Sequence, residues 1–144
     1  MSDTAYSHPW QANVLSVLRI VAGLLFLQHG LMKLFGFPAP FPGHVVGLYL
    51  VAGLIETIGG ILVCVGLLTR PAAFIMSGEM AFAYFMSHAP KAAFPVLNGG
   101  ELAILYCFAF LYLAFAGGGA WSLDRVIAGP RSWLAGPLAG PETA

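Results

Sequence analysis

The sequence predicts an all-α fold: an integral membrane four-helix bundle with both termini on the same side. Of its 144 residues, 59% are hydrophobic and only 8% are charged, whereas about a quarter of the residues in a typical soluble domain are charged. Four apolar segments, at residues 12–35, 45–68, 72–88 and 98–116, are each long enough as helices to cross about 30 Å of hydrocarbon. Because four spans return the chain to its starting side, the termini are expected to share that side.

The chain is expected to form one domain. Residues 1–11 are a short polar N-terminus, residues 12–124 contain the four predicted spans, and residues 125–144 form a tail rich in Pro, Gly and Ala that is expected to be poorly ordered. Residues 1–11 lack the basic region of a signal peptide, so the first segment is predicted to be a retained span. The formal net charge is zero, so no basic patch indicates nucleic-acid binding.

The segment at residues 45–68 has a carboxylate, Glu56, near its midpoint, where an ionised side chain costs at least about 2.5 kcal/mol. At about 100° per residue, the small residues Gly53, Gly59 and Gly60 lie on the same side of the helix as Glu56. Small residues let another helix approach closely. Glu56 is therefore predicted to face protein and not lipid.

A second carboxylate, Glu79, lies near the centre of the segment at residues 72–88, and His88 falls on the opposite face of that segment. Two neighbouring carboxylates in a medium of low dielectric cannot both stay ionised without a cation, and Arg19 lies on the polar face of the first segment. We predict a hydrogen-bonded Arg19–Glu56 contact with Glu79 as a third member. This buried polar cluster either handles a proton or a polar ligand head group, or it fixes the helix register.

Four residues near the opposite mouth of the bundle are candidates for binding a ligand: His29, Lys33, Asn98 and Glu101. His29 and Lys33 share one helix face at spacing i and i+4. For Asn98 and Glu101 a local role is the alternative, because the two residues fit a helix N-cap with a reciprocal glutamate. No metal site is expected, because no H-x-x-x-H or E-x-x-H spacing occurs on any one segment. A quinone or another small molecule with a polar head is the expected ligand.

Basic residues are distributed unevenly between the two ends of the predicted bundle. The positive-inside rule places the end with more Lys and Arg in the cytoplasm. The distribution favours cytoplasmic termini, with Arg19, Arg70, Arg125 and Arg131 toward that end and Lys33 and Lys91 toward the other.

Several motifs resemble the DoxX family of small four-helix bacterial membrane proteins. With Arg19, they are FLQHGLMKLFG at residues 26–36, GLIETIGGILVCVGLLTR at 53–70, NGGELAILY at 98–106 and WSLD at 121–124. The resemblance implies a bacterial inner-membrane protein associated with redox chemistry, since some relatives act in thiosulfate:quinone oxidoreduction or in complexes that manage oxidative stress. The family supplies no agreed catalytic residue. His29, Lys33, Glu56, Arg70, Asn98 and Glu101 also fall on its motifs, whereas Glu79 does so less clearly.

Three functions follow as hypotheses. The first is a redox-associated, quinone-linked subunit or accessory protein, at most a non-catalytic or quinone-binding subunit of an oxidoreductase. Because the sequence has no haem motif, dithiol or nucleotide loop, this function needs redox partner proteins. The second is a small transporter or proton-coupled channel subunit, and the third is a structural scaffold for a membrane complex. All three place the chain in a lipid bilayer and allow a homo-oligomer.

Overall fold

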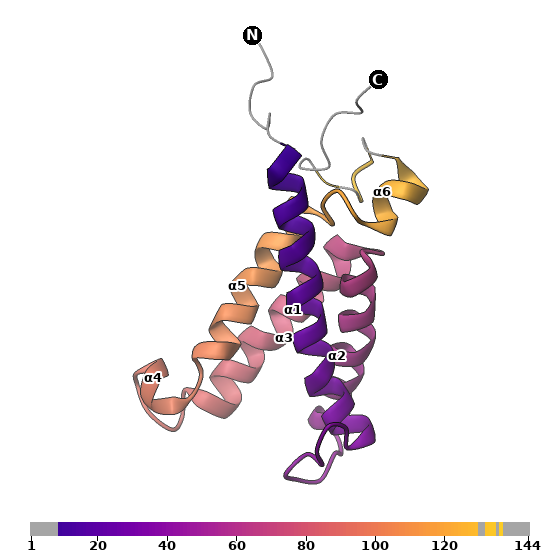
Figure 1. The fold of residues 1–144 in the computed structure, drawn as a ribbon. Helices are drawn as coiled ribbons and strands as arrows, with labels where there is room; N and C mark the ends of the chain where they lie inside the picture. Colours follow the sequence, from indigo (N-terminus) through magenta and orange to yellow (C-terminus); the bar gives the residue numbers. More distant parts are fainter. Residues whose placement is uncertain (1–8, 130–131, 135, 137–144) are drawn as a thin grey trace.

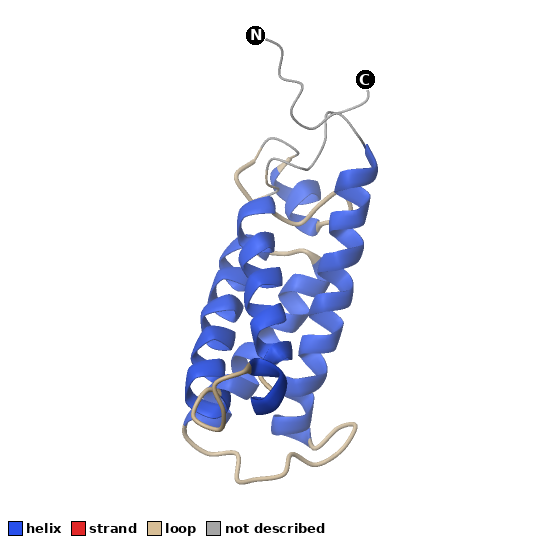
Figure 2. Cartoon of the chain, turned by 90° about the vertical axis from the view of Figure 1, so that its left-hand side faces the viewer, coloured by secondary structure: helices blue, strands red, loops and turns tan. Residues whose placement is uncertain are grey.

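The computed structural model describes residues 9–129, 132–134 and 136, and in these residues helices are the only regular secondary structure (Figures 1 and 2). The elements are α1 (Pro9–Phe35), α2 (Leu48–Val65), α3 (Thr69–Ala83), the π-helix η1 (Tyr84–His88), α4 (Pro95–Asn98), α5 (Glu101–Ala116) and α6 (Leu123–Ala128). The predicted all-helical class is confirmed for this part of the chain. Helices α1 and α2 are long and apolar enough to cross a membrane, and α5 is apolar but shorter.

Helix α2 ends where the chain changes direction at Gly66. The backbone of Gly66 is left-handed, with φ 74°, and its N–H donates to the carbonyls of Leu62 and Val63. Leu67 N–H also donates to Leu62, which completes a glycine C-cap. Glycine fits here because it adopts positive φ without a steric penalty.

Helix α3 begins at Thr69, earlier than the predicted boundary of 72, although Pro71 follows. Proline is tolerated in the first turn, where its missing N–H would have no helical partner. The carboxylate of Asp124 satisfies two of the free donors at this end, from Leu68 N–H at 2.7 Å and from Thr69 N–H at 2.9 Å. A residue after the last long helix therefore caps α3.

The segment after α5 is more structured than predicted. Helix α6 is present, and the Ser122 hydroxyl accepts from the N–H of Arg125 at 3.3 Å. The Arg70 guanidinium carbon lies 4.5 Å from the ring centroid of Trp133, and Arg70 donates to the Trp133 carbonyl at 2.8 Å. The prediction of poor order is wrong for these residues. Positions 130–131, 135 and 137–144 of the predicted tail, and 1–8 of the predicted polar N-terminus, lie outside the described residues.

The long helices form two closely packed pairs, α1 with α2 and α3 with α5. The pairs lie together near α6 and diverge toward the opposite end, where α4 and the α1–α2 connection lie (Figure 1). Contacts between α1 and α5 are sparse. The largest fully buried apolar side chains are Phe26, Phe110, Met76, Leu113 and Val63. The fold therefore has a packed end near α6 and an open end.

Glycines allow the close packing of α1 against α2. A Cβ atom at Gly23 would lie 2.8 Å from Cys64 Sγ, and one at Gly60 would lie 2.9 Å from Leu27 Cβ. Gly59 meets the third helix instead, because its Cβ would lie 2.7 Å from Met76 Sδ. The predicted close approach of other helices to the small-residue side of α2 is confirmed.

Gly30→Ala should lower the free energy of unfolding by about 1–3 kcal/mol, because an added Cβ overpacks this interface. That Cβ would lie 2.6 Å from the backbone nitrogen of Thr57, which cannot move independently of α2. Gly78→Ala is the matched control, since its Cβ would meet nothing within 4 Å. Reversible unfolding in mixed detergent micelles, followed by circular dichroism, measures both variants. Equal stability of the two would contradict the close α1–α2 contact.

Candidate functional site: a cavity between the helix pairs

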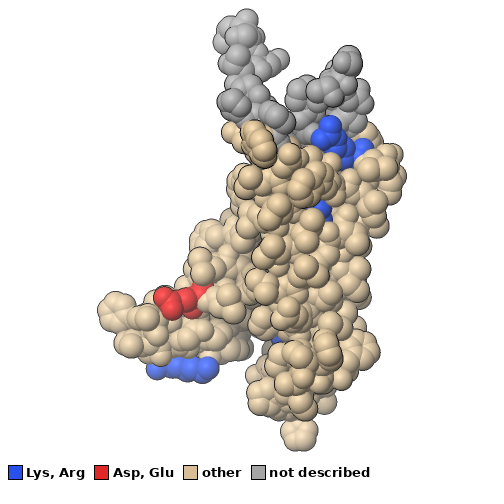
Figure 3. Space-filling view, in the orientation of Figure 1, with Lys and Arg blue, Asp and Glu red and all other residues tan. Residues whose placement is uncertain are grey.

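A cavity of about 790 Å³ lies between the two helix pairs at the open end of the bundle. The space-filling view shows the molecule divided there into two lobes (Figure 3). Exposed apolar residues of α2 and α3, among them Val51, Ile75 and Phe82, form part of the lining, so the cavity reaches the surface between these helices. This volume is within the range of small-molecule sites, which are mostly apolar with a few convergent polar groups. The polar or titratable side chains in the lining are His29, Lys33, Tyr49, Glu56, Glu79, Ser87, His88 and Tyr106.

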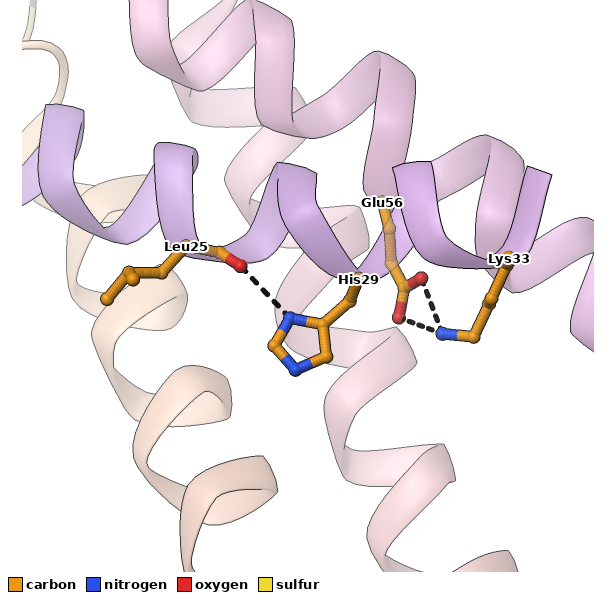
Figure 4. Close-up of polar contacts among 4 residues, drawn as sticks. All are labelled: Leu25, His29, Lys33 and Glu56. Carbon is orange, nitrogen blue, oxygen red and sulfur yellow. Dashed lines mark hydrogen bonds and ion pairs between the residues drawn. The ribbon is translucent and has the colours of Figure 1, made fainter. Parts of the chain in front are cut away.

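An ion pair between α1 and α2 forms part of the cavity wall. Lys33 Nζ lies 2.5 Å from Oε1 and 2.5 Å from Oε2 of Glu56 (Figure 4). The side chains of Lys33 and Glu56 are only 11% and 4% exposed. The prediction that Glu56 faces protein is confirmed, and its partner is a lysine one helix away. In a buried position this pairing provides the charge compensation that each group needs.

His29 lies one helical turn from Lys33, and its ring points to the same side as the Glu56 carboxylate (Figure 4). Its Nδ1 lies 3.0 Å from the carbonyl oxygen of Leu25. Because a carbonyl only accepts, this contact assigns the proton to Nδ1. Nε2 of the neutral ring then keeps its lone pair. His29 lines the cavity, and only its Nδ1 is engaged by the Leu25 carbonyl.

Glu79 of α3 contributes the second carboxyl group of the cavity. Both of its oxygens are buried, and neither has a hydrogen-bond partner in the described part of the chain. Glu79 lines the same cavity as Glu56 and Lys33. A buried polar group without a partner is costly, and in native proteins such groups are rare.

Aromatic rings of the hydrophobic core also form part of the cavity lining. Phe26 packs edge-on against Tyr106, with ring centroids 5.3 Å apart, and against Phe110 at 4.8 Å. The His29 ring approaches Tyr106 edge-on at 6.1 Å. Phe26 and Tyr106 line the cavity, so a ligand there would contact aromatic side chains.

His88 also lines the cavity, so its predicted position on the face opposite Glu79 is wrong. The prediction assumed α-helical geometry throughout the segment. Residues 84–88 instead form the π-helix η1, whose wider turn holds an additional residue and rotates the following side chains. His88 Nδ1 lies 3.1 Å from the Asn98 carbonyl oxygen, which ties η1 to α4.

Asn98 and Glu101 are not among the residues that line the cavity. The predicted capping pair is wrong as well, because Asn98 ends α4, and α5 begins at Glu101 with Gly100 as its N-cap. The Asn98 side chain accepts from Gly100 N–H at 2.8 Å and donates to the Ala92 carbonyl at 2.9 Å. Asn98 therefore shapes the α4–α5 turn, and Glu101 is an exposed residue in the first turn of α5.

Arg19 is fully buried, but it lies away from the cavity and does not pair with Glu56. Its guanidinium donates to four backbone carbonyls: Val63 and Cys64 at 2.5 Å each, Gly118 at 2.8 Å and Trp121 at 3.0 Å. The predicted Arg19–Glu56 contact is therefore wrong. Carbonyls in the last turn of a helix lack helical partners and carry partial negative charge, so the end of α2 attracts the cation. Val63 is seven residues beyond Glu56 along α2, a rise of roughly 10 Å.

We name the contact of Arg19 with these four carbonyls the arginine clasp. It joins α1 to the end of α2 and to the segment that follows α5. The interpretation of the buried charges as a device that fixes helix register therefore suits Arg19, whereas Glu56 and Glu79 line the open cavity. In the described residues, no group of three or more His, Cys, Asp or Glu side chains is arranged to hold a metal ion.

Comparison with known proteins identifies the family. The DoxX family model matches residues 14–89. The chain is also 50% identical over 118 residues to an uncharacterized protein of Haemophilus influenzae, and the alignment covers 77% of this chain and 88% of that protein. No solved structure matches the chain. Together with the apolar helices, these matches indicate a membrane protein. The chain belongs to the DoxX family.

Proposed function

We propose that this DoxX protein is a quinone-linked, redox-associated subunit or accessory protein, and that the cavity between its helix pairs holds a quinone ring. The observation that carries the proposal is the cavity of about 790 Å³, whose mostly apolar lining converges on a few polar groups. A quinone has a flat apolar ring with two polar oxygens. Such a molecule needs aromatic walls and a small number of directed hydrogen bonds.

The lining offers both kinds of contact. Phe26 and Tyr106 are aromatic residues of the lining, and the ammonium of Lys33 and the hydroxyl of Tyr106 would supply donors for ligand oxygens. The apolar side of the cavity between α2 and α3 would let an isoprenoid tail extend into surrounding lipid. A cavity open to lipid would admit a molecule that is dissolved in the bilayer.

The proposal includes an arrangement in the membrane. α1, α2, α3 with η1, and α5 would be four spans of a bacterial inner-membrane protein with cytoplasmic termini. α6, which contains Arg125, lies near the end of the bundle where α1 begins (Figure 1), and the start of α3, which contains Arg70, contacts α6 through Asp124. Basic residues at this end fit the positive-inside rule for a cytoplasmic end. The cavity would then lie in the half of the membrane away from the cytoplasm. Because the sequence has no haem motif, dithiol or nucleotide loop, the proposal requires a redox partner protein that supplies or accepts electrons.

Filling the cavity should weaken quinone binding. Gly78 lines the cavity and an added Cβ there would meet nothing within 4 Å, so Gly78→Trp should project a large ring into open space. We expect it to weaken binding of decylubiquinone by roughly tenfold or more, as overpacking of about 1–3 kcal/mol implies. Gly78→Ala is the control and should bind as the unmodified protein does. Titration of the purified protein in nanodiscs, with extraction and quantification of co-purified quinone, measures the effect.

A folded protein that carries no quinone and binds neither ubiquinone nor menaquinone analogues would contradict this function. The transporter hypothesis is favoured by one observation, the two acidic side chains in an open cavity. Proteoliposome flux that disappears in Glu79→Gln, in a protein that binds no quinone, would support transport instead.

A further inference from the structure

The short helix α6, which follows the last long helix, directs its side chains to three different surroundings. At about 100° per residue, Leu123, Val126 and Ile127 share one side of α6, and Arg125 lies toward the opposite side. Asp124 lies between these two sides and is buried. Val126 is 78% exposed and Ile127 is 71% exposed, so the apolar side of the helix points away from the rest of the protein.

Hydrogen bonds of Asp124 hold α6 in this orientation. Its carboxylate accepts from the N–H groups of Leu68 and Thr69, at 2.7 and 2.9 Å. Its own N–H donates to the carbonyl of Gly66 at 2.8 Å. These bonds tie the buried side of α6 to the turn between α2 and α3. The apolar side is therefore a fixed, exposed surface of the fold, and its contact with water would be unfavourable.

The same end of the bundle contains the three tryptophans of the sequence, and each is more than half exposed. Trp10 lies in the first turn of α1, and Trp121 immediately precedes the N-cap of α6. Trp133 packs on Arg70, whose guanidinium carbon lies 4.5 Å from the ring centroid. Lys or Arg side chains also reach the surface at this end (Figure 3). Exposed tryptophans are typical of a membrane–water interface, which accommodates both the apolar ring and its polar N–H.

We propose that α6 is an interfacial helix that binds the membrane surface and recognises anionic phospholipids there. Leu123, Val126 and Ile127 enter the outer part of the acyl-chain region, and Arg125 on the polar side meets the anionic head groups. This inference rests on the proposed arrangement of the long helices in the membrane, and it is independent of the ligand of the cavity.

The size and the charge of this surface favour lipid over a protein partner. A helix of six residues offers little area, whereas a stable protein interface buries about 800 Å² on each partner. Asp124 is turned inward and engaged by backbone donors, so Arg125 is the charged group that α6 presents to its surroundings. A positive charge beside apolar side chains complements an anionic phospholipid, which has a negative head group above an apolar tail.

Photocross-linking identifies what lies against α6. A photoreactive side chain is introduced as Val126→p-benzoylphenylalanine in the full chain, which is reconstituted into vesicles with equal amounts of phosphatidylcholine and phosphatidylglycerol. Mass spectrometry identifies the adducts after irradiation. We expect lipid adducts in which phosphatidylglycerol exceeds phosphatidylcholine by about fivefold, the factor that one arginine near an anionic surface supplies. Arg125→Gln in the same background should bring this ratio to about one.

Two further positions calibrate the measurement. Ala128 is exposed on the side of α6 that carries Arg125, so the same photoreactive residue there should give a several-fold lower yield of lipid adducts than at Val126. Leu105 is an exposed residue of α5 and reports the lipid contact of a proposed span. Because all three positions are exposed, the replacements should leave the packed core unchanged.

The outcomes separate this inference from the proposed function. Adducts at Val126 that contain a second protein, or no lipid adducts there while Leu105 yields them, would overturn the interfacial role of α6 and leave the membrane arrangement in place. Equal amounts of the two phospholipids at Val126 would overturn the recognition of anionic head groups. Absence of lipid adducts at both positions would overturn the membrane arrangement and this inference together. Quinone titration of the unmodified protein tests the cavity separately.

Discussion

Replacing Arg19 with alanine should lower the free energy of unfolding by roughly 3–5 kcal/mol, because four backbone carbonyls lose their donor at once. Arg19 is 0% exposed, and its four acceptors come from the end of α2 and from the segment after α5. Neither lipid nor the neighbouring apolar side chains can replace these bonds. Equilibrium unfolding in mixed detergent micelles, followed by circular dichroism, measures the loss.

Two control variants test the arginine clasp. Arg19→Lys keeps the charge but loses the planar fork of donors, so it should recover only part of the stability. Lys91→Ala removes an exposed cation of the described structure and should change stability by less than about 0.5 kcal/mol. If Arg19→Ala were as stable as Lys91→Ala, the clasp would contribute nothing to the fold.

Replacing Lys33 with methionine should have a comparable effect, also roughly 3–5 kcal/mol, because it strands a buried carboxylate. Lys33 Nζ is the donor to both oxygens of Glu56, and Glu79 adds a second acidic group to the same site. The double variant Lys33→Met/Glu56→Gln should recover much of the loss, because the stranded charge disappears. The same unfolding measurement on the single and double variants gives the coupling free energy between the two residues.

The rescue should be specific to Lys33. Glu56→Gln should not rescue Arg19→Ala, because Arg19 donates to backbone carbonyls and not to Glu56. A double variant Lys33→Met/Glu56→Gln that is no more stable than Lys33→Met would contradict the ion pair. If Glu56→Gln did rescue the stability of Arg19→Ala, that result would support the Arg19–Glu56 contact predicted from the sequence.

The helical class and the environment of Glu56 could be predicted because both depend on local pattern. Long apolar segments indicate helices for a membrane. The repeat of small residues on one side of α2 indicates which face meets other helices, and Gly59 and Gly60 do contact neighbouring helices. Burial of Glu56 follows from its place on that face. None of these inferences needs the relative positions of residues that are far apart in sequence.

The choice of cation for Glu56 does depend on such positions, and the sequence-based prediction failed there. The prediction pairs Arg19 with a carboxylate and does not include backbone carbonyls among the acceptors. In the structure the Arg19 guanidinium turns toward the backbone carbonyls of Val63 and Cys64 at the end of α2, and Lys33 approaches Glu56 from the other end of α1. The sequence does contain a signal for the Lys33–Glu56 pair: the two residues have opposite charges, and each lies on a helix face that carries small residues. Helix register, which decides the pairing, is a tertiary property.

The predictions of the position of His88 and of the start of α5 are wrong for a different reason. Both predictions extended regular helix geometry across places where the backbone departs from it. The π-helix η1 rotates His88 toward the cavity, and the short helix α4 occupies residues that were assigned to the beginning of the last span. Neither departure has a periodic signal in the sequence, because each covers only four or five residues.

The arginine clasp imposes an order in time on the synthesis of the protein. Arg19 is among the first residues made, its partners Val63 and Cys64 follow 44 and 45 residues later, and Gly118 and Trp121 follow 99 and 102 residues later. At about 5–20 residues per second, Arg19 waits roughly 5–20 seconds for its last two acceptors. During that interval the helix pair α1–α2 exists with its buried cation only half satisfied. A chain truncated before Gly118 therefore contains the sequences of all four long helices but only two of the four acceptors of Arg19.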